Sequence, residues 1–259
     1  MTVVFDLYVP GTSWLHRLDP RVKLWGTILG FALPFILPDL ASQAMFLIAI
    51  HVVLLTASIP RRAIGRFWRQ MAILIVLILV LQPFLRPSGK VLFTVGPLKL
   101  TVDGLHDAAR LALRALGIAF VTAALLLTTE QPALIQALLR LGLPYTWGLT
   151  ISLALRFLPA LQGLFRTVRD AQSARGWTLE GNPVRRLRAY IPVLVAVLIG
   201  TLRMSDQLTL ALASRGLETM KTRTTWRPLR MGTLDWAILI AMTLGFAGLV
   251  WVRATLWGR

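Results

Sequence analysis

Cysteine is absent from this chain of 259 residues. A disulfide framework, a thiolate metal site and a cysteine nucleophile are therefore excluded. Histidine is scarce as well, and His16, His51 and His106 are too scattered in the sequence to suggest a metal site. We accordingly expect neither a bound metal nor a cofactor.

Several motifs of enzymes are also missing. The sequence contains no GxxxxGK[ST] phosphate-binding loop, no HExxH zinc motif and no GxSxG nucleophile motif. Only 11 residues are acidic, and few of them fall in apolar segments, where a proton or ion relay would need them. These absences disfavour an enzyme, including an ATPase, and an ion-coupled carrier.

Apolar residues dominate what is present. They make up 56% of the chain, and the mean hydropathy of +0.68 is well above that of a soluble domain. A net charge of +17 in a soluble protein would suggest nucleic acid binding. Here the basic residues concentrate between apolar segments, as they do in cytoplasmic loops. We therefore predict an all-α, polytopic protein whose environment is the lipid bilayer and which binds no nucleic acid.

Five apolar segments are predicted to span the membrane, because each approaches the roughly 20 residues that a bilayer requires. They run from Val22 to Leu37, Leu40 to Ala57, Met71 to Leu85, Leu111 to Thr129 and Trp236 to Val252. Basic residues precede the first segment and fill a predicted loop at 59–69, which places the N-terminus in the cytoplasm. The arginines of that loop are Arg61, Arg62, Arg66 and Arg69. Residues 86–107 are expected outside, with a short β-hairpin around Gly96-Pro97.

A basic module is predicted between Glu130 and Arg230, where fourteen Lys/Arg face five Asp/Glu. We expect it on the cytoplasmic side, with about three amphipathic helices. These are predicted from Gln131 to Leu141, from Tyr145 to Ala174 and from Ala189 to Leu212. The chain would then comprise a four-span region (1–129), the coupling helices (130–230) and a C-terminal transmembrane helix (231–259).

Two triplets of a small residue, Arg and Gly lie in this module: Ala174-Arg175-Gly176 and Ser214-Arg215-Gly216. Each pattern fits a helix end, because Gly can adopt the left-handed conformation after the cap and Arg complements the negative end of the helix dipole. Capping alone would explain one triplet. Two copies at the ends of basic helices suggest equivalent ends that dock onto something outside the bilayer.

Three strings of residues point to a known family. They are Leu18-Asp19-Pro20-Arg21-Val22-Lys23-Leu24, Arg156-Phe157-Leu158-Pro159-Ala160-Leu161 and Ala171-Gln172-Ser173-Ala174-Arg175-Gly176. In their order and spacing with the second triplet, they resemble the T component of energy-coupling factor (ECF) transporters over nearly the whole chain. The resemblance implies a scaffold in a bacterial or archaeal cell (inner) membrane. It would couple two cytosolic ABC-type ATPases to a small membrane S component that binds a vitamin or a transition-metal ion.

The resemblance also implies roles for individual residues. Arg175 and Arg215 would couple to the ATPases, with Ala174, Gly176, Ser214 and Gly216 as close neighbours; Ser214 replaces the usual Ala. Asp19, Pro20, Arg21, Lys23, Arg156 and Pro159 belong to the family strings. Taken alone, Asp19-Pro20 is also typical of a helix start, Arg21 and Lys23 of positive-inside anchors, and Arg156 of a structural cation.

Two other classes of function remain open on the residues alone. A self-contained secondary transporter would show inverted repeats and broken polar helices at mid-membrane, which the asymmetric layout disfavours. A membrane-embedded lipid-modifying enzyme would need clustered acids or histidines at the end of a span. The sequence shows no such cluster.

Overall fold

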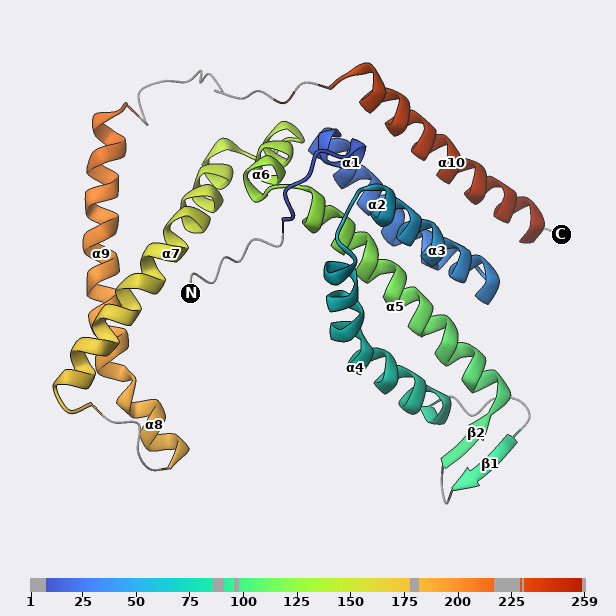
Figure 1. Cartoon of the computed structure of the whole chain (residues 1–259), viewed down its shortest axis with the longest axis horizontal. Coiled ribbons are helices and arrows are strands. Elements are labelled where there is room, and N and C mark those ends of the chain that lie inside the picture. The colour runs from blue at the N-terminus through green and yellow to red at the C-terminus, as the bar shows by residue number, and fades with distance from the viewer. Residues whose placement is uncertain are drawn as a thin grey trace. The chain divides into compact units, whose positions relative to one another are not determined.

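The computed structural model describes residues 8–85, 91–95, 98–177, 182–216, 229 and 231–257 (Figure 1). Contacts between elements divide the chain into two units. The core unit contains α1 to α6, the strands β1 and β2, and α10, whereas the arm unit contains α7, α8 and α9. The predicted all-α class of a polytopic membrane protein is confirmed.

The elements follow one another in this order. The core unit begins with α1 (Trp14–Arg17), α2 (Pro20–Ile36), α3 (Leu40–Thr56), α4 (Arg61–Leu85), β1 (Val91–Val95), β2 (Leu98–Thr101), α5 (Val102–Thr128) and α6 (Gln131–Arg140). The arm unit consists of α7 (Tyr145–Ala174), α8 (Pro183–Ala189) and α9 (Ile191–Ser214). The last element, α10 (Thr233–Trp257), returns to the core unit.

The central helix of the core unit is α5, which contacts α2, α3 and α4. Its buried residues recur every three to four positions and form one face of the helix. The main apolar cluster joins this face to α3, the α3–α4 turn and the start of α4. It consists of Leu47, Ile50, Leu54, Ala57, Ile59, Ile64, Leu116, Phe120, Ala123 and Leu127.

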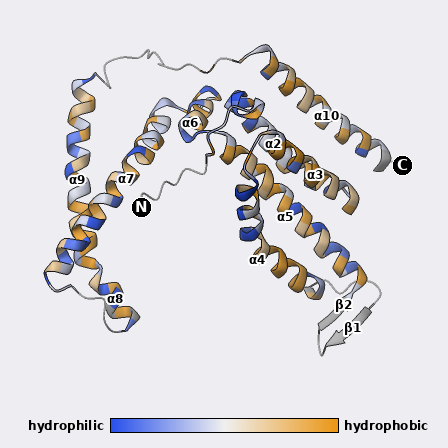
Figure 2. Ribbon diagram, in the orientation of Figure 1, coloured by the Kyte–Doolittle hydropathy of each residue, from blue (hydrophilic) through white to orange (hydrophobic). Residues whose placement is uncertain are grey.

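The predicted loop at 59–69 is wrong, because α4 begins at Arg61. The backbone N–H groups of Ala63 and Ile64 donate to the carbonyl of Pro60 and start the helix there. Its four arginines therefore lie on the first turns of a helix that continues into an apolar segment, as the change from hydrophilic to hydrophobic colour along α4 shows (Figure 2). Arginine is a good helix former, so a basic segment need not be a loop.

The helix predicted from 189 to 212 corresponds to α9, which begins and ends two residues later, and a separate short helix, α8, precedes it. α8 ends at Ala189, Tyr190 follows it, and α9 begins at Ile191. Pro192 explains the break, because proline has no N–H to bond the preceding turn and fits best in the first turn of a helix.

Five helices in the described ranges are long and apolar enough to cross a membrane: Arg61–Phe84, Val102–Thr128, Tyr145–Ala174, Arg186–Ser214 and Thr233–Thr255. Three of them, in α4, α5 and α10, overlap predicted spans almost completely. The other two predicted spans correspond to α2 and α3, each of 17 residues, or about 26 Å of helix, near the lower limit for crossing a bilayer. The remaining two of the five are α7 and the helical stretch that contains α9, which are predicted as amphipathic helices. Length and composition alone do not distinguish a spanning helix from a long amphipathic one.

The predicted β-hairpin is confirmed. β1 and β2 pair antiparallel, with Val95 opposite Leu98 and Val91 opposite Thr101. The Thr101 hydroxyl then accepts a hydrogen bond of 3.2 Å from the N–H of Gly104. This N-cap explains why α5 begins at Val102, earlier than the predicted span.

Side chains from three other helices cap the C-terminal end of α2. Gln43 of α3 and Arg114 of α5 both donate to the carbonyl of Pro34. Arg253 of α10 donates to the carbonyls of Phe35 and Ile36. Helix ends leave carbonyls without an intrahelical partner, and here the core unit supplies the missing donors.

Candidate functional site at two helix ends

The first triplet forms the C-terminal end of α7. Arg175 caps the helix, and Gly176 follows with a φ of +87°. The N–H of Gly176 donates to the carbonyl of Ser173 at 3.0 Å, and the N–H of Trp177 donates to the carbonyl of Gln172 at 3.0 Å. These are the two bonds of a Schellman motif, which pairs carbonyls that the last helical turn leaves open.

The second triplet ends α9 in the same conformation. Arg215 caps the helix, and Gly216 has a φ of +71°. The N–H of Gly216 donates to the carbonyl of Ala213 at 2.9 Å. The hydroxyl of Ser214 donates to the carbonyl of Ala211 at 3.0 Å. This hydroxyl is therefore satisfied within its own helix.

Two further helix ends separate the role of the glycine from that of the arginine. α3 is capped by Ala57, followed by Ser58 with a φ of +56°. α6 is capped by Leu141, followed by Gly142 with a φ of +112°. The turn thus needs a residue that accepts a positive φ, but it does not need an arginine at the cap. Capping explains the triplet glycines, whereas the turn can form without the two arginines.

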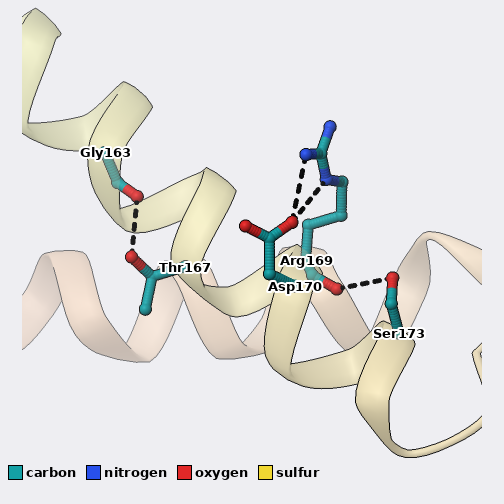
Figure 3. A network of polar contacts seen from close by, with 5 residues as sticks. All are labelled: Gly163, Thr167, Arg169, Asp170 and Ser173. Carbon is teal, nitrogen blue, oxygen red and sulfur yellow. Dashed lines mark hydrogen bonds and ion pairs between the residues drawn. The ribbon is translucent and has the colours of Figure 1, made fainter.

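Both arginines are exposed. Within the described ranges, neither makes a hydrogen bond or an ion pair through its guanidinium. An acidic neighbour of the first, Asp170, is instead paired with Arg169 at 3.0 Å, on the exposed surface of α7 (Figure 3). Ser173 donates back to the Arg169 carbonyl at 3.0 Å. The guanidinium of Arg175 is therefore exposed and does not form an ion pair with Asp170 of its own helix.

Trp177 ties the end of α7 to the start of α9. Its indole Nε1 donates to the carbonyl of Ala189 at 2.5 Å. Its ring meets the ring of Tyr190 edge-on, with centroids 5.3 Å apart. The first triplet is consequently held beside the α8–α9 junction.

The family string at the N-terminus starts α2. Asp19 is the N-cap, and its Oδ1 accepts a hydrogen bond of 2.9 Å from the N–H of Arg21. Pro20 occupies the first helical turn, where its missing N–H costs nothing. The Arg21 Nε lies 3.9 Å from the same Asp19 oxygen. These residues form a helix start, as the N-cap and proline rules predict.

Lys23 is a buried structural residue, because only 8% of it is exposed. Its Nζ donates to the carbonyl of Thr128 at 2.9 Å, to the hydroxyl of Thr129 at 3.2 Å and to the carbonyl of His16 at 3.4 Å. All three donors of the ammonium are thus used. Lys23 is therefore not a solvated positive-inside anchor.

Asp235 completes this junction from the other end of the chain. Its Oδ1 accepts from the N–H of Asp19 at 2.9 Å, and its Oδ2 accepts from the N–H of Gly232 at 2.8 Å. The ends of α1, α2, α5 and α10 therefore meet at one polar cluster, which we call the four-helix junction (Asp19, Lys23, Thr128, Thr129 and Asp235). The sequence patterns do not single out Asp235 or the two threonines.

The remaining family string belongs to the arm unit. Arg156 and Pro159 lie one turn apart on α7, in the arm unit, and both are exposed. The three histidines lie on separate helices, and no group of three or more His, Asp or Glu in the described ranges is placed to hold a metal ion. The exposed charged candidates are thus the two arginines of the triplets and Arg156.

Comparison with known proteins decides the family. A family model described as CbiQ, cobalt transport protein, matches residues 11–226. This chain belongs to the CbiQ/EcfT family. The energy-coupling factor transporter transmembrane protein EcfT of Thermosediminibacter oceani is 35% identical over 97% of this chain and 98% of its own length. The protein of the same name from Listeria innocua is 31% identical over 97% of this chain and 98% of its own length.

A third relative of this CbiQ/EcfT chain has a different name. A Bifidobacterium longum protein named as an ABC transporter ATP-binding protein is 33% identical over 93% of this chain, which corresponds to only 32% of that relative. The CbiQ/EcfT chain is a multi-pass membrane protein and a transmembrane component of ECF transporters. Members of its family are transport components rather than enzymes.

Proposed function

We propose that this chain is the coupling scaffold of an ECF-type importer and that Arg175 and Arg215 dock it onto two cytosolic ATPases. One observation carries the proposal: two helices end in the same turn, and each presents an exposed arginine that the turn itself does not need. A guanidinium is permanently charged and offers a fixed fork of donors, which suits carboxylates and carbonyl oxygens in a groove. Ala174, Gly176, Ser214 and Gly216 would allow close approach around each arginine.

The Bifidobacterium longum relative supports an ATPase partner. Its printed name is that of an ATP-binding protein, and a segment similar to this chain makes up 32% of it. In this relative, the segment similar to this chain shares one polypeptide with the part that its name describes as ATP-binding. This favours physical association between the present chain and a separate ATPase. Since the present sequence has no phosphate-binding loop, ATP hydrolysis is assigned to separate subunits.

The remaining parts of the proposal concern the membrane. Residues 130–230 would form the coupling region on the cytoplasmic side, flanked by the spans in 1–129 and 231–259. The arginines on the first turns of α4 support a cytoplasmic position for that end and for the N-terminus. The core unit would hold a small S component that binds the substrate, a vitamin or a transition-metal ion.

The first test is mass spectrometry of what co-purifies with the tagged wild-type chain from native membranes in mild detergent. Two ABC-type ATPases and a small hydrophobic protein are expected, and the small protein would identify the substrate class. Recovery of the chain alone, still active in uptake, would contradict the proposal and favour a self-contained secondary transporter. Recovery of the chain alone with activity on lipids would favour a lipid-modifying enzyme.

The second test addresses the two arginines. The double variant Arg175→Glu and Arg215→Glu should insert normally but lose transport, with ATPase recovery at least about tenfold lower, since reversing both charges at an interface removes several kcal/mol. Arg203→Glu is the matched control, because Arg203 is an exposed arginine on α9 outside the triplets. Undiminished ATPase recovery by the double variant would refute docking through these arginines.

A further inference from the structure

Two contacts place the end of α7 along the first half of α9. The first is the hydrogen bond from Trp177 to the carbonyl of Ala189, together with the ring contact to Tyr190. The second lies further along both helices, where a methyl group at Gly200 would meet Leu164 Cδ2 at 2.9 Å. From the first contact to the second, the residue number falls from 177, just after α7, to 164 within it, and rises from 189, just before α9, to 200 within it. The two helices therefore run antiparallel (Figure 1).

The two contacts fix where each triplet lies relative to α9. Arg175 is two residues from Trp177 and is therefore held near the start of α9. Arg215 caps the other end of the same helix. The distance between the two arginines is consequently set by the length of α9, whose 24 residues span about 36 Å at 1.5 Å per residue.

The second half of α9 continues without a break beyond the contact with α7. No proline interrupts α9 after Pro192, at its start. Leu202 and Leu210 are 58% and 71% exposed, so the helix continues past the contact with α7 at Gly200 while still carrying an open face. A continuous helix is stiff over this length, since sharp bends arise at prolines, bulges or inserted groups.

We propose that α9 is a spacer of fixed length between the two docking ends and that Trp177 is the positioning residue that holds the first end at its start. This rests on the proposed function, in which each end binds one ATPase. Two linked binding events reinforce one another only when their spacing matches the partner, and the reinforcement is lost when the geometry fails. A scaffold with the correct spacing would bind a pair of ATPases far more tightly than a single one.

The absence of cysteine makes a direct measurement practical, because two introduced cysteines are then the only labelling sites. Ser173→Cys and Ala213→Cys are suitable, since both positions are exposed and neither is a triplet residue. Pulsed electron spin resonance on the full chain with two spin labels should give one narrow distance distribution centred between about 30 and 40 Å. Trp177→Ala should broaden it at least twofold, and Trp177→Phe, which keeps the ring but loses the N–H donor, should give an intermediate width.

Trp147→Ala is the matched control, because Trp147 is a tryptophan of α7 that is 62% exposed. It should leave the distribution unchanged. In parallel, immobilised variants are tested for binding of the partner ATPases as single subunits and as the ATP-locked pair. Trp177→Ala should retain single-subunit binding within twofold but lose at least tenfold in binding of the pair.

The outcomes separate the spacer from the docking hypothesis. An unchanged distance distribution in Trp177→Ala would overturn the spacer, whatever the ATPases do. A broadened distribution with undiminished binding of the pair would overturn it as well, because the spacing would then be irrelevant to docking. Failure of the Arg175 and Arg215 charge reversals to affect ATPase recovery would instead defeat the proposed function while leaving the distance measurement valid.

Discussion

The ammonium of Lys23 donates a hydrogen bond of 2.9 Å to the backbone carbonyl of Thr128, 105 residues later in the chain. Thr128 is the last residue of α5, and α6 starts three residues later. α6 in turn contacts α2, the helix that carries Lys23. Lys23, which the sequence alone suggests is a basic residue flanking a span, therefore fixes the point at which the chain leaves α5.

Replacing Lys23 with Met should destabilise the protein by about 2 to 3 kcal/mol, because the change leaves a buried carbonyl and hydroxyl without their charged donor. Thermal unfolding in detergent measures the effect. Arg17→Met is the control, because Arg17 is an exposed basic residue of the same N-terminal segment and should change stability by no more than about 0.5 kcal/mol. Equal effects of the two changes would show that Lys23 acts only as a charge at the membrane surface.

Asp235→Ala should loosen the start of α10, because both oxygens of Asp235 accept backbone hydrogen bonds. Hydrogen exchange at Asp19 and Gly232 should rise at least about tenfold, which corresponds to loss of roughly one hydrogen bond. Asp235→Asn keeps one acceptor oxygen and should protect Asp19 or Gly232 but not both. Unaltered exchange in Asp235→Ala would contradict the four-helix junction.

Ser58→Gly should stabilise the core unit by about 1 kcal/mol, because Ser58 has a φ of +56°, which costs every residue except glycine. Chemical unfolding in detergent provides the measurement. Ser58→Ala should not stabilise the protein, since alanine has the same difficulty at positive φ. A gain in stability from alanine as large as that from glycine would show that the serine side chain, and not the backbone, limits this turn.

Gly176→Ala separates capping from close approach to a partner. No atom lies within 4 Å of the position a Cβ would take, so the change should cost stability only through the positive φ, by about 1 kcal/mol. Gly142→Ala is an apt control, because Gly142 has the same open surroundings and a positive φ but lies outside the triplets. The two variants should unfold alike, while ATPase binding should fall only in Gly176→Ala; equal binding in both would argue against close approach at this glycine.

The contact between Leu164 of α7 and Gly200 of α9 can be tested by moving the large side chain from one helix to the other. Gly200→Leu should separate the helices and broaden the distance between labels on their ends, because its side chain would occupy the space of Leu164. Combining it with Leu164→Ala should restore the narrow distribution. Gly163→Leu on α7 should have no such effect, since nothing lies within 4 Å of that position. Failure of the double variant to restore the distance would mean that volume at this contact does not hold the helices together.

The sequence predicts the ends of a helix well where a proline precedes the helix and a glycine follows it. The predicted bounds of α7 agree with the structure, since Pro144 precedes the helix and Gly176 accepts the positive φ that ends it. The predicted start of α4 is wrong, because a cluster of four arginines is typical of a cytoplasmic loop, whereas arginine also supports a helix. Charge alone does not identify secondary structure.

The partners of buried polar groups could not be predicted from the sequence. Lys23 binds two threonines more than 100 positions away, and one of its acceptors is a backbone carbonyl, which every residue carries. Trp177 likewise donates to the carbonyl of Ala189. Only the folded chain determines which carbonyl is left open at which helix end, so such contacts leave no pattern in the residue types.

The cap on α2 also bears on the order in which the protein can be completed during synthesis. α2 leaves the ribosome well before α10, yet the carbonyls of Phe35 and Ile36 receive their donor from Arg253 of α10. At the other end of α2, the N–H of Asp19 likewise finds its acceptor on Asp235. Both ends of α2 therefore await α10, and the core unit reaches its final hydrogen bonding only after the arm unit, which lies between these two helices in the chain, has been made.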